Sequence, residues 1–357
     1  MIRQITGLVI IAAALLLFTG CPNNNHFEQG QFPYDPVNFG AVNSEFDDYN
    51  STAPFIEDDR YLLFSSNRNS EGENFDIVGS NMKIFWDKGK GELTVDDQQS
   101  TWKNFSYTDT MLMMVNTGAN ELGPNSVTYF NDMVSMHSYT HILTYAHDPS
   151  GNLDLHFTWY DGYNYDYYPT GGTYHDPRPI VFLNSEFNDA YLTFYGQNYA
   201  DYGDQYYTIP YITEMLFCSD RTGQFDIFTV NIPGENSLID FLSDSAAVLV
   251  SPTEILNSSS DDKCPYINGE LLVFASNRPG GYGGFDLYFS QREGENWTEP
   301  KNFGERINTE YDEYRPIVLY NYEFVNEMMI FSSNRPGGQG GYDLYYVGIP
   351  QMSLYRL

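Results

Sequence analysis

Short apolar runs recur along the chain, and each is followed by a small polar turn and then by an Asp that opens an aromatic run. The clearest copies are LLVFASNRPGGYGGFDLYF at residues 271–289 and MMIFSSNRPGGQGGYDLYY at residues 328–346. A third copy, LLFSSNRNSEGENFDIV, occupies residues 62–78, and shorter versions lie at residues 142–157 and 215–228. Short continuous apolar runs bounded by turn residues predict strands buried on both faces. Their recurrence predicts a repeat architecture in which each unit buries its faces against its neighbours.

A second pattern lies upstream of each copy. It reads NFGERINTEYDEYRPIV at residues 302–318, with echoes at residues 38–56, 255–267 and, more faintly, as TYHDPRPIV at 173–181. One unit is therefore a turn with Asn and Asp, a Pro-led strand, an apolar strand, a Gly-rich turn and an Asp-led aromatic strand. The glycines at residues 280–284 are expected to supply the positive φ of a tight hairpin. This order of elements predicts the blade of a β-propeller.

The repeat count predicts an all-β fold: a single propeller of five four-stranded antiparallel blades. The marker aspartates are 78, 72, 60 and 57 residues apart, so five units fill the chain, with insertions in the early ones. A sixth, degenerate blade around residues 83–115 stays an alternative, since KIFWDKGKGELTV has the pattern of a hairpin. The spare linker pattern at residues 38–46 suggests that the N-terminal segment completes the last blade and covers its exposed edge.

Aspartate and arginine recur at fixed places around the polar turn. Each aspartate is expected to accept backbone N–H bonds in the turn and to begin the next strand. A catalytic group is not needed once per blade, so both sets are interpreted as structural. The repeat positions are Asp76, Asp154, Asp226, Asp286, Asp343, Arg68, Arg221, Arg278 and Arg335.

The SNRPGG…GGxDLY signature at residues 276–288 and 333–345, with the linker at residues 302–316, resembles the TolB-type, WD-repeat-like propeller repeats of bacterial envelope proteins. The resemblance covers about residues 36–347 and fades over residues 79–140. It implies a cell-envelope propeller that acts as a recognition platform. Relatives frequently carry a C-terminal OmpA-like peptidoglycan-binding domain, and the sequence departs from that arrangement by stopping at Leu357.

The first residues have the pattern of an export signal. Residues 1–20 carry one Arg, an apolar core and small residues before Cys21, a pattern typical of a signal peptide. FTGC resembles the lipobox of bacterial lipoproteins, so Cys21 is the expected lipidation site, and an ordinary secretory signal with an incidental Cys is the alternative. Residues 21–33 are then the lipidated Cys and a polar tether, and residues 34–357 the TolB-like propeller. We expect a Bacteroidetes-like outer-membrane lipoprotein of the cell envelope, with the periplasmic and the surface-exposed side both open.

Composition narrows the partners. A net charge of -31 in 357 residues repels nucleic acid and anionic lipid surfaces, which leaves the acyl chains of Cys21 as the contact with the membrane. Hydrophobic residues make up 41% of the chain and aromatic ones 17%, enough for a core. A disulfide between Cys218 and Cys264 is an open alternative in an oxidising compartment.

Motifs that carry chemistry are missing from the sequence. There is no GxSxG, HExxH, Walker or CxxC motif, so no catalytic residue is assigned. His137 and His141 have a spacing that aligns metal ligands on a helix, but their segment has the pattern of a strand or loop. No cofactor or metal is expected. The fragment REGENW at residues 292–297 faintly resembles the sialidase Asp-box but lacks its aspartate.

An aromatic and acidic pair of segments is the best candidate for a binding surface. WYDGYNYDYYP at residues 159–169 and YADYGDQYY at residues 199–207 hold far more Tyr than blade cores need. Tyr combines a broad apolar face with a hydroxyl group, which suits protein or glycan recognition. Solvated loops packing over the rim, or calcium held by the alternating aspartates, are the alternatives. The candidate residues are Trp159, Tyr160, Tyr163, Tyr165, Tyr167, Tyr202 and Tyr206.

Two classes of function remain after this survey. The first is a non-enzymatic, membrane-anchored lipoprotein whose propeller serves as an interaction scaffold for another envelope protein, as the family resemblance implies. The second is a carbohydrate-binding or carbohydrate-active propeller that uses the Tyr-rich and Asp-rich segments as a platform and carboxylates of the central channel as acid and base.

Overall fold

Five antiparallel sheets form the body of the protein in a computed structural model. The structure describes residues 27–53, 60–96, 106–130, 138–165, 168–196, 212–233, 237–246 and 248–353. The expected signal peptide and Cys21 therefore lie outside the described residues. The first strand of each sheet contacts the first strand of the next, and that of the fifth contacts that of the first, which closes a ring. The fold is a five-bladed β-propeller, as the repeats predicted.

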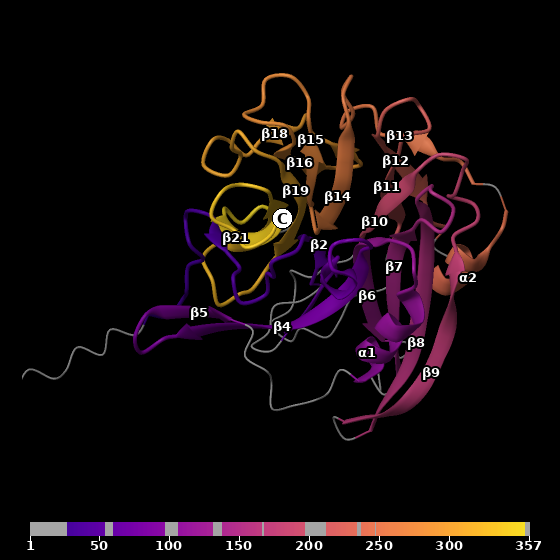
Figure 1. The fold of residues 1–357 in the computed structure, drawn as a ribbon, viewed down its shortest axis with the longest axis horizontal. Helices are drawn as coiled ribbons and strands as arrows, with labels where there is room; N and C mark the ends of the chain where they lie inside the picture. The colour runs from indigo at the N-terminus through magenta and orange to yellow at the C-terminus, as the bar shows by residue number, and fades with distance from the viewer. Residues whose placement is uncertain are drawn as a thin grey trace, which may run out of the picture.

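The blades follow one another in sequence around the ring, as the colours of Figure 1 show. Blade 1 contains β2 (Asp48–Thr52), β3 (Arg60–Ser66), β4 (Asp76–Asp87) and β5 (Glu92–Asp96). Blade 2 contains β6 (Glu121–Phe130), β7 (Ser138–His147), β8 (Asp154–Tyr165) and β9 (Tyr168–Pro179). Blade 3 contains β10 (Asp189–Tyr195), β11 (Glu214–Ser219), β12 (Asp226–Asn231) and β13 (Ser251–Pro252).

The last two blades hold the clearest sequence repeats. Blade 4 contains β14 (Asp262–Asn268), β15 (Leu271–Ser276), β16 (Asp286–Glu293), β17 (Asn296–Trp297) and β18 (Lys301–Asn302). Blade 5 contains β19 (Glu313–Leu319), β20 (Glu327–Ser333) and β21 (Asp343–Ile349), and its fourth strand is β1 (Val37–Asn38). The N-terminal segment therefore closes the last blade, as expected.

Among the described residues, three short helices interrupt the strands. They are η1 (Arg68–Ser70), α1 (Ser106–Val115) and α2 (Leu238–Ser243). Within the described ranges, no helix has the length and apolar character needed to cross a membrane. The hairpin predicted within residues 83–95 exists as β4 and β5, but it belongs to blade 1, so it is not a sixth blade.

Each second strand is buried on both faces, which explains its continuous apolar sequence. In β15 all six residues are buried, and the same holds for the seven residues of β20. Burial of this kind stabilises a blade only when a neighbouring blade covers each face. The largest hydrophobic cluster accordingly joins residues of blades 1, 4 and 5.

The linker between blades is a clamp made by an asparagine side chain. Asn308 Oδ1 accepts the backbone N–H of Leu287 at 2.8 Å, and its Nδ2 donates to the carbonyl oxygen of the same residue at 3.0 Å. The amide thus takes the place of a strand next to the third strand of the blade. The same pair of bonds is made by Asn43, Asn116, Asn184 and Asn257.

These asparagines reveal a linker pattern that the sequence analysis only partly found. Each asparagine is the first residue of a six-residue pattern. Ser or Thr is second, the third and fourth residues vary, Asp or Asn is fifth, and Asp or Glu is sixth. The five copies lie at residues 43–48, 116–121, 184–189, 257–262 and 308–313. The faint echo assigned to residues 173–181 was wrong: those residues lie mainly in β9, and the linker into blade 3 follows it. The copies at 116–121 and 184–189 were missed because both have Asn at the fifth place, where the three recognised copies have Asp.

The Gly-rich turn of blade 4 is built differently from the expectation. Gly280 has φ +94°, whereas Gly281, Gly283 and Gly284 do not have positive φ. A Cβ atom on Gly283 would lie 2.3 Å from the carbonyl oxygen of Tyr311 in the next linker. One glycine therefore supplies the backbone conformation, and Gly283 is required because the turn packs against the neighbouring linker.

Candidate functional site

The repeated aspartates begin the third strand of every blade. Asp286 accepts the backbone N–H groups of Tyr282 and Gly283, at 2.8 and 3.1 Å, and so holds the turn before β16. Asp343 accepts those of Gln339 and Gly340 in the same way. The other three begin β4, β8 and β12. Their place in the sheets accounts for them without any catalytic role.

The repeated arginines bind the carboxylate that begins the first strand of their own blade. Arg278 Nη2 lies 2.6 Å from Asp262 Oδ1, and the guanidinium also donates to the carbonyl oxygen of Leu256 in the linker. Equivalent ion pairs join Arg68 to Asp48, Arg221 to Asp189, and Arg335 to Glu313. The first-strand carboxylates are fully buried in all four pairs, so each arginine stabilises a charge that would otherwise be unpaired.

Each first strand has one residue of left-handed conformation. Asn50, Gly123, Tyr191, Cys264 and Arg315 have φ between 42° and 60°, and each lies at a bulge of its strand. Arg315 is fully buried and donates to the carbonyl oxygens of Pro265 and Pro124, at 3.0 and 3.2 Å. Its guanidinium also lies 5.5 Å from the ring of Tyr191.

These five residues do not supply the acid and base that the second class of function placed in the central channel. The five bulge residues that the structure describes include no carboxylate, and the buried guanidinium of Arg315 lies among them. Four of the five acidic side chains that begin the first strands are engaged with arginines, and the fifth, that of Glu121, lies beside His147.

Part of the predicted aromatic surface forms an open groove on blade 2. The groove has a volume of about 560 Å3 and lies over β7, β8 and β9, with the segment around α2 at its side. Its lining residues are Ser138, Thr140, Trp159, Asp161, Gly162, Tyr163, Thr173, His175, Ser237 and Ile239. Five of them carry a hydroxyl group, and one carries a carboxylate.

Asp161 is the centre of the groove's hydrogen bonds. Its Oδ1 accepts from the Thr140 hydroxyl at 2.6 Å, and its Oδ2 accepts from Trp159 Nε1 at 3.2 Å. His175 Nε2 lies 2.9 Å from the same Oδ2, and its ring stacks on Trp159 with 4.0 Å between centroids. The side chains of His175 and Asp161 remain 28% and 35% exposed. The pair is therefore held in place and still reachable from solvent.

The predicted aromatic residues divide between core and surface. Trp159 and Tyr160 are buried, Tyr160 next to Tyr139 and Tyr174, whereas Tyr163 is 48% exposed and lines the groove. These residues lie in the long strands β8 and β9, which extend beyond the other blades in Figure 1, and not in a loop. Tyr165 ends β8. Tyr167, Tyr202 and Tyr206 lie outside the described residues.

The remaining candidates give no metal or redox site. Cys218 and Cys264 are free and buried, and burial raises the pKa of the Cys264 thiol to about 12. His141 lies within β7, where burial lowers its pKa to about 4. His137 lies outside the described residues. Across the described ranges, no group of three or more His, Cys, Asp or Glu side chains could hold a metal ion.

Comparison with known proteins finds likeness in fold. No protein-family model matches the chain, and no curated protein matches its sequence. Among solved structures, it resembles a GH62 hydrolase in complex with xylotriose, with a TM-score of 0.48, 11% identity, and coverage of 91% of this chain and 100% of that one. A protein described as a glycoside hydrolase gives a TM-score of 0.46 with 9% identity, and covers 92% and 94%. A glycosyl hydrolase from Bacteroides ovatus gives 0.42 with 9% identity, and covers 89% and 94%.

The expected functional class is corrected at this point. The non-enzymatic scaffold was expected from a family resemblance, and it has no counterpart among these solved structures, which are described as hydrolases. Identities of 9 to 11% limit the likeness to the fold, so the site itself must decide what this chain does.

Proposed function

We propose that this chain is a carbohydrate-active protein that binds a glycan in the groove of blade 2. The observation that carries the proposal is the position of Asp161, a carboxylate that lines an open groove together with hydroxyl groups and the exposed ring of Tyr163. Sugar hydroxyls both donate and accept hydrogen bonds, so they match a surface of carboxylate, hydroxyl and imidazole groups. The ring of Tyr163 adds an apolar face for the C–H side of a sugar.

The groove also has the groups that proton transfer needs. An imidazole can serve as a general acid or base, and Asp161 holds the ring of His175 in one orientation. The canonical hydrolytic pair is two carboxylates, and Asp161 is the single acidic residue among the groove's described lining residues. In a hydrolytic reaction we therefore assign the proton exchange to His175 and the stabilisation of positive charge to Asp161.

The net charge narrows the glycan class. At -31, the chain repels polyanionic polysaccharides at low ionic strength. The groove itself contains no lysine or arginine among its described lining residues that could offset this repulsion. A neutral glycan is therefore the expected ligand.

The location of the protein belongs to the same proposal. The TolB-type repeat signature and the FTGC sequence support an outer-membrane lipoprotein anchored through acyl chains on Cys21. The proposed partners are then an envelope glycan and an envelope protein that presents it. Incorporation of a labelled fatty acid into the protein, and its loss in Cys21→Ser, tests the anchor.

Glycan binding by wild type and two groove variants tests the function. A glycan array, followed by titration and by measurement of released reducing ends, should identify a neutral glycan whose binding weakens in both Tyr163→Ala and Asp161→Asn and whose turnover is lost in Asp161→Asn. Tyr322→Ala is the matched control, since Tyr322 is 50% exposed and does not line the groove. Equal glycan binding by wild type and Asp161→Asn would overturn the proposal.

A further inference from the structure

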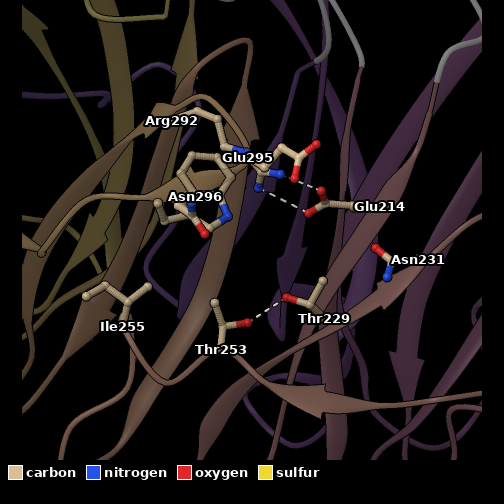
Figure 2. A pocket seen from close by; sticks show the side chains of 9 residues that line it. Glu214, Thr229, Asn231, Thr253, Ile255, Arg292, Glu295 and Asn296 are labelled. Carbon is tan, nitrogen blue, oxygen red and sulfur yellow. Dashed lines mark hydrogen bonds and ion pairs between the residues drawn. The ribbon is translucent and has the colours of Figure 1, made fainter.

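A second cleft lies between the outer strands of blade 3 and the β16 and β17 hairpin of blade 4, as Figure 2 shows. Its volume is about 450 Å3, within the range of about 300–1,000 Å3 that is usual for small-molecule sites. Its lining residues are Glu214, Thr229, Asn231, Thr253, Ile255, Arg292, Glu295, Asn296 and Trp297. Four of these residues, Arg292, Glu295, Asn296 and Trp297, belong to the REGENW fragment, to which the sequence alone assigned no function.

The floor of this cleft is a fixed arginine. Arg292 Nη1 and Nη2 donate to the two carboxylate oxygens of Glu214, at 3.1 and 2.5 Å, an interaction drawn in Figure 2. The guanidinium also lies 4.5 Å from the ring centre of Tyr195 and 5.1 Å from that of Trp297. The side chain of Arg292 is 7% exposed. A two-point ion pair and two rings therefore hold it in a single orientation.

Two buried N–H donors of this floor have no acceptor among the described residues. They are Arg292 Nε and Trp297 Nε1, and both side chains line the cleft. Trp297 is 6% exposed. Each of these two atoms has less than 1 Å2 of accessible surface, so a ligand oxygen reaches it only after a small movement of the neighbouring side chains. That contact would remove the free-energy cost of an unsatisfied buried donor. The floor is therefore suited to a ligand that brings hydrogen-bond acceptors.

The rim of the cleft offers groups that both donate and accept. Asn231 and Asn296 are exposed on opposite sides, and the hydroxyls of Thr229 and Thr253 lie 2.5 Å apart between them. Glu214 neutralises Arg292, so the exposed Glu295 leaves the cleft with a net negative charge. An anionic ligand is therefore repelled, and a neutral ligand rich in hydroxyl groups is favoured.

We infer that this cleft is a second saccharide site, which takes one or two neutral sugar units; the ligand class rests on the function proposed above. Sugar hydroxyls accept from the floor donors and donate to Glu295 and the two asparagine oxygens. A peptide is less suited, because the one aliphatic side chain among the described lining residues is Ile255. The cleft and the groove of blade 2 are neighbours in sequence, since Asn231 and Ser237 line one each.

Both sites also lie on one side of the propeller. Asp161 and Arg292 come near the ends of third strands, and Ser138 and Glu214 come at the starts of second strands. In an antiparallel blade these positions meet at one edge, opposite the turns that hold the repeated aspartates. Both sites therefore face the same side of the ring.

Titration of neutral trisaccharides tests the cleft separately from the groove. The probes are cellotriose, mannotriose and galactotriose, with sialyllactose as the anionic comparison and a neutral tripeptide as the alternative ligand class. In an Asp161→Asn background, which removes the groove site, at least one neutral trisaccharide should still bind. Asn231→Ala with Asn296→Ala should weaken that binding about tenfold or more, as the loss of two hydrogen bonds implies. Trp297→Phe should weaken it too, because the indole N–H is lost and an aromatic ring is kept.

The outcomes separate the two proposals. The control is Asn69→Ala, an exposed asparagine in the turn after β3, for which no change in affinity is expected. The cleft inference is wrong if no neutral trisaccharide binds Asp161→Asn. It is also wrong if neither the double asparagine substitution nor Trp297→Phe changes the affinity for the trisaccharide. Tighter binding of the tripeptide or of sialyllactose than of the neutral sugars would equally contradict it. Glycan binding to wild type that depends on Asp161 alone would leave the groove proposal standing and overturn this one.

Discussion

His147 Nδ1 lies 2.9 Å from Glu121 Oε1 in blade 2, whereas in each of the other four blades an arginine side chain binds the first-strand carboxylate. Glu121 is fully buried, and Thr117 donates to it from both its hydroxyl and its backbone N–H. In blade 2 a histidine, whose charge depends on pH, therefore takes the role that a permanently charged arginine has in the other blades. The stability of blade 2 should therefore depend on pH.

Glu121→Gln should remove a pH dependence of stability. Burial raises the pKa of Glu121 from its ordinary value of 4.5 to about 7. Between these values the folded protein holds a proton that the unfolded chain has released, so the stabilising contribution is complete below about pH 4.5 and is lost as the pH rises through about 7. Urea unfolding from pH 5 to 8 should show Glu121→Gln gaining stability relative to wild type as the pH rises. A constant difference between the two proteins would contradict this origin.

Arg278→Met should destabilise the protein by about 3–5 kcal/mol, because it leaves the buried carboxylate of Asp262 unpaired. The free energy of unfolding from denaturant titration measures the effect. Adding Asp262→Asn to the same chain should recover part of the loss, since the uncompensated charge is then gone. Lys301→Met, at an exposed residue of β18, serves as the control. A loss no larger than that of the control would show that the ion pair is dispensable.

Removal of the closing strand should destabilise the ring as a whole. Phe39 donates its N–H to Leu344 at 2.8 Å and buries its side chain, next to the two residues of β1 that pair with β21. Phe39→Ala should cost about 3–5 kcal/mol, as expected for a buried aromatic residue. Val37→Ala, at an exposed residue of the same strand, should cost far less. Thermal unfolding of both variants checks this, and similar melting temperatures would argue against a role of this segment in closure.

Cys218 and Cys264 should resist thiol reagents in the folded protein. Both are fully buried, and burial raises the pKa of each thiol well above its ordinary value. The thiolate is the reactive form, so modification should require unfolding. In a Cys21→Ser background, Ellman's reagent at pH 8 should react with both thiols of the protein unfolded in guanidinium chloride. In the native protein, both thiols should react far more slowly. Rapid reaction of the native protein would show that this part of the core opens.

Much of the fold could be predicted from the sequence, because its main determinants are local. Apolar runs such as residues 271–276 specify the buried second strands, and each following Asp forms hydrogen bonds within four residues. The start of blade 2 at residues 116–121 could not be recognised from the sequence. The first Asn and the last acidic residue of the six-residue pattern are the ones that make the structural contacts, and the sequence does not show those contacts. The asparagine clamp became visible only when Asn116 was seen beside Ile77, 39 residues away.

The sequence by itself determined the strands, their turns and the number of blades, since these follow from periodicity and from contacts between near neighbours in the chain. Only the tertiary structure decided which polar side chains share a site. Asp161 meets His175 because β8 and β9 pair, and Arg292 meets Glu214 across two blades, 78 residues apart. Such contacts depend on how strands and blades pack around the ring. This packing brings side chains that are distant in the sequence together, and no periodic pattern in the sequence marks them.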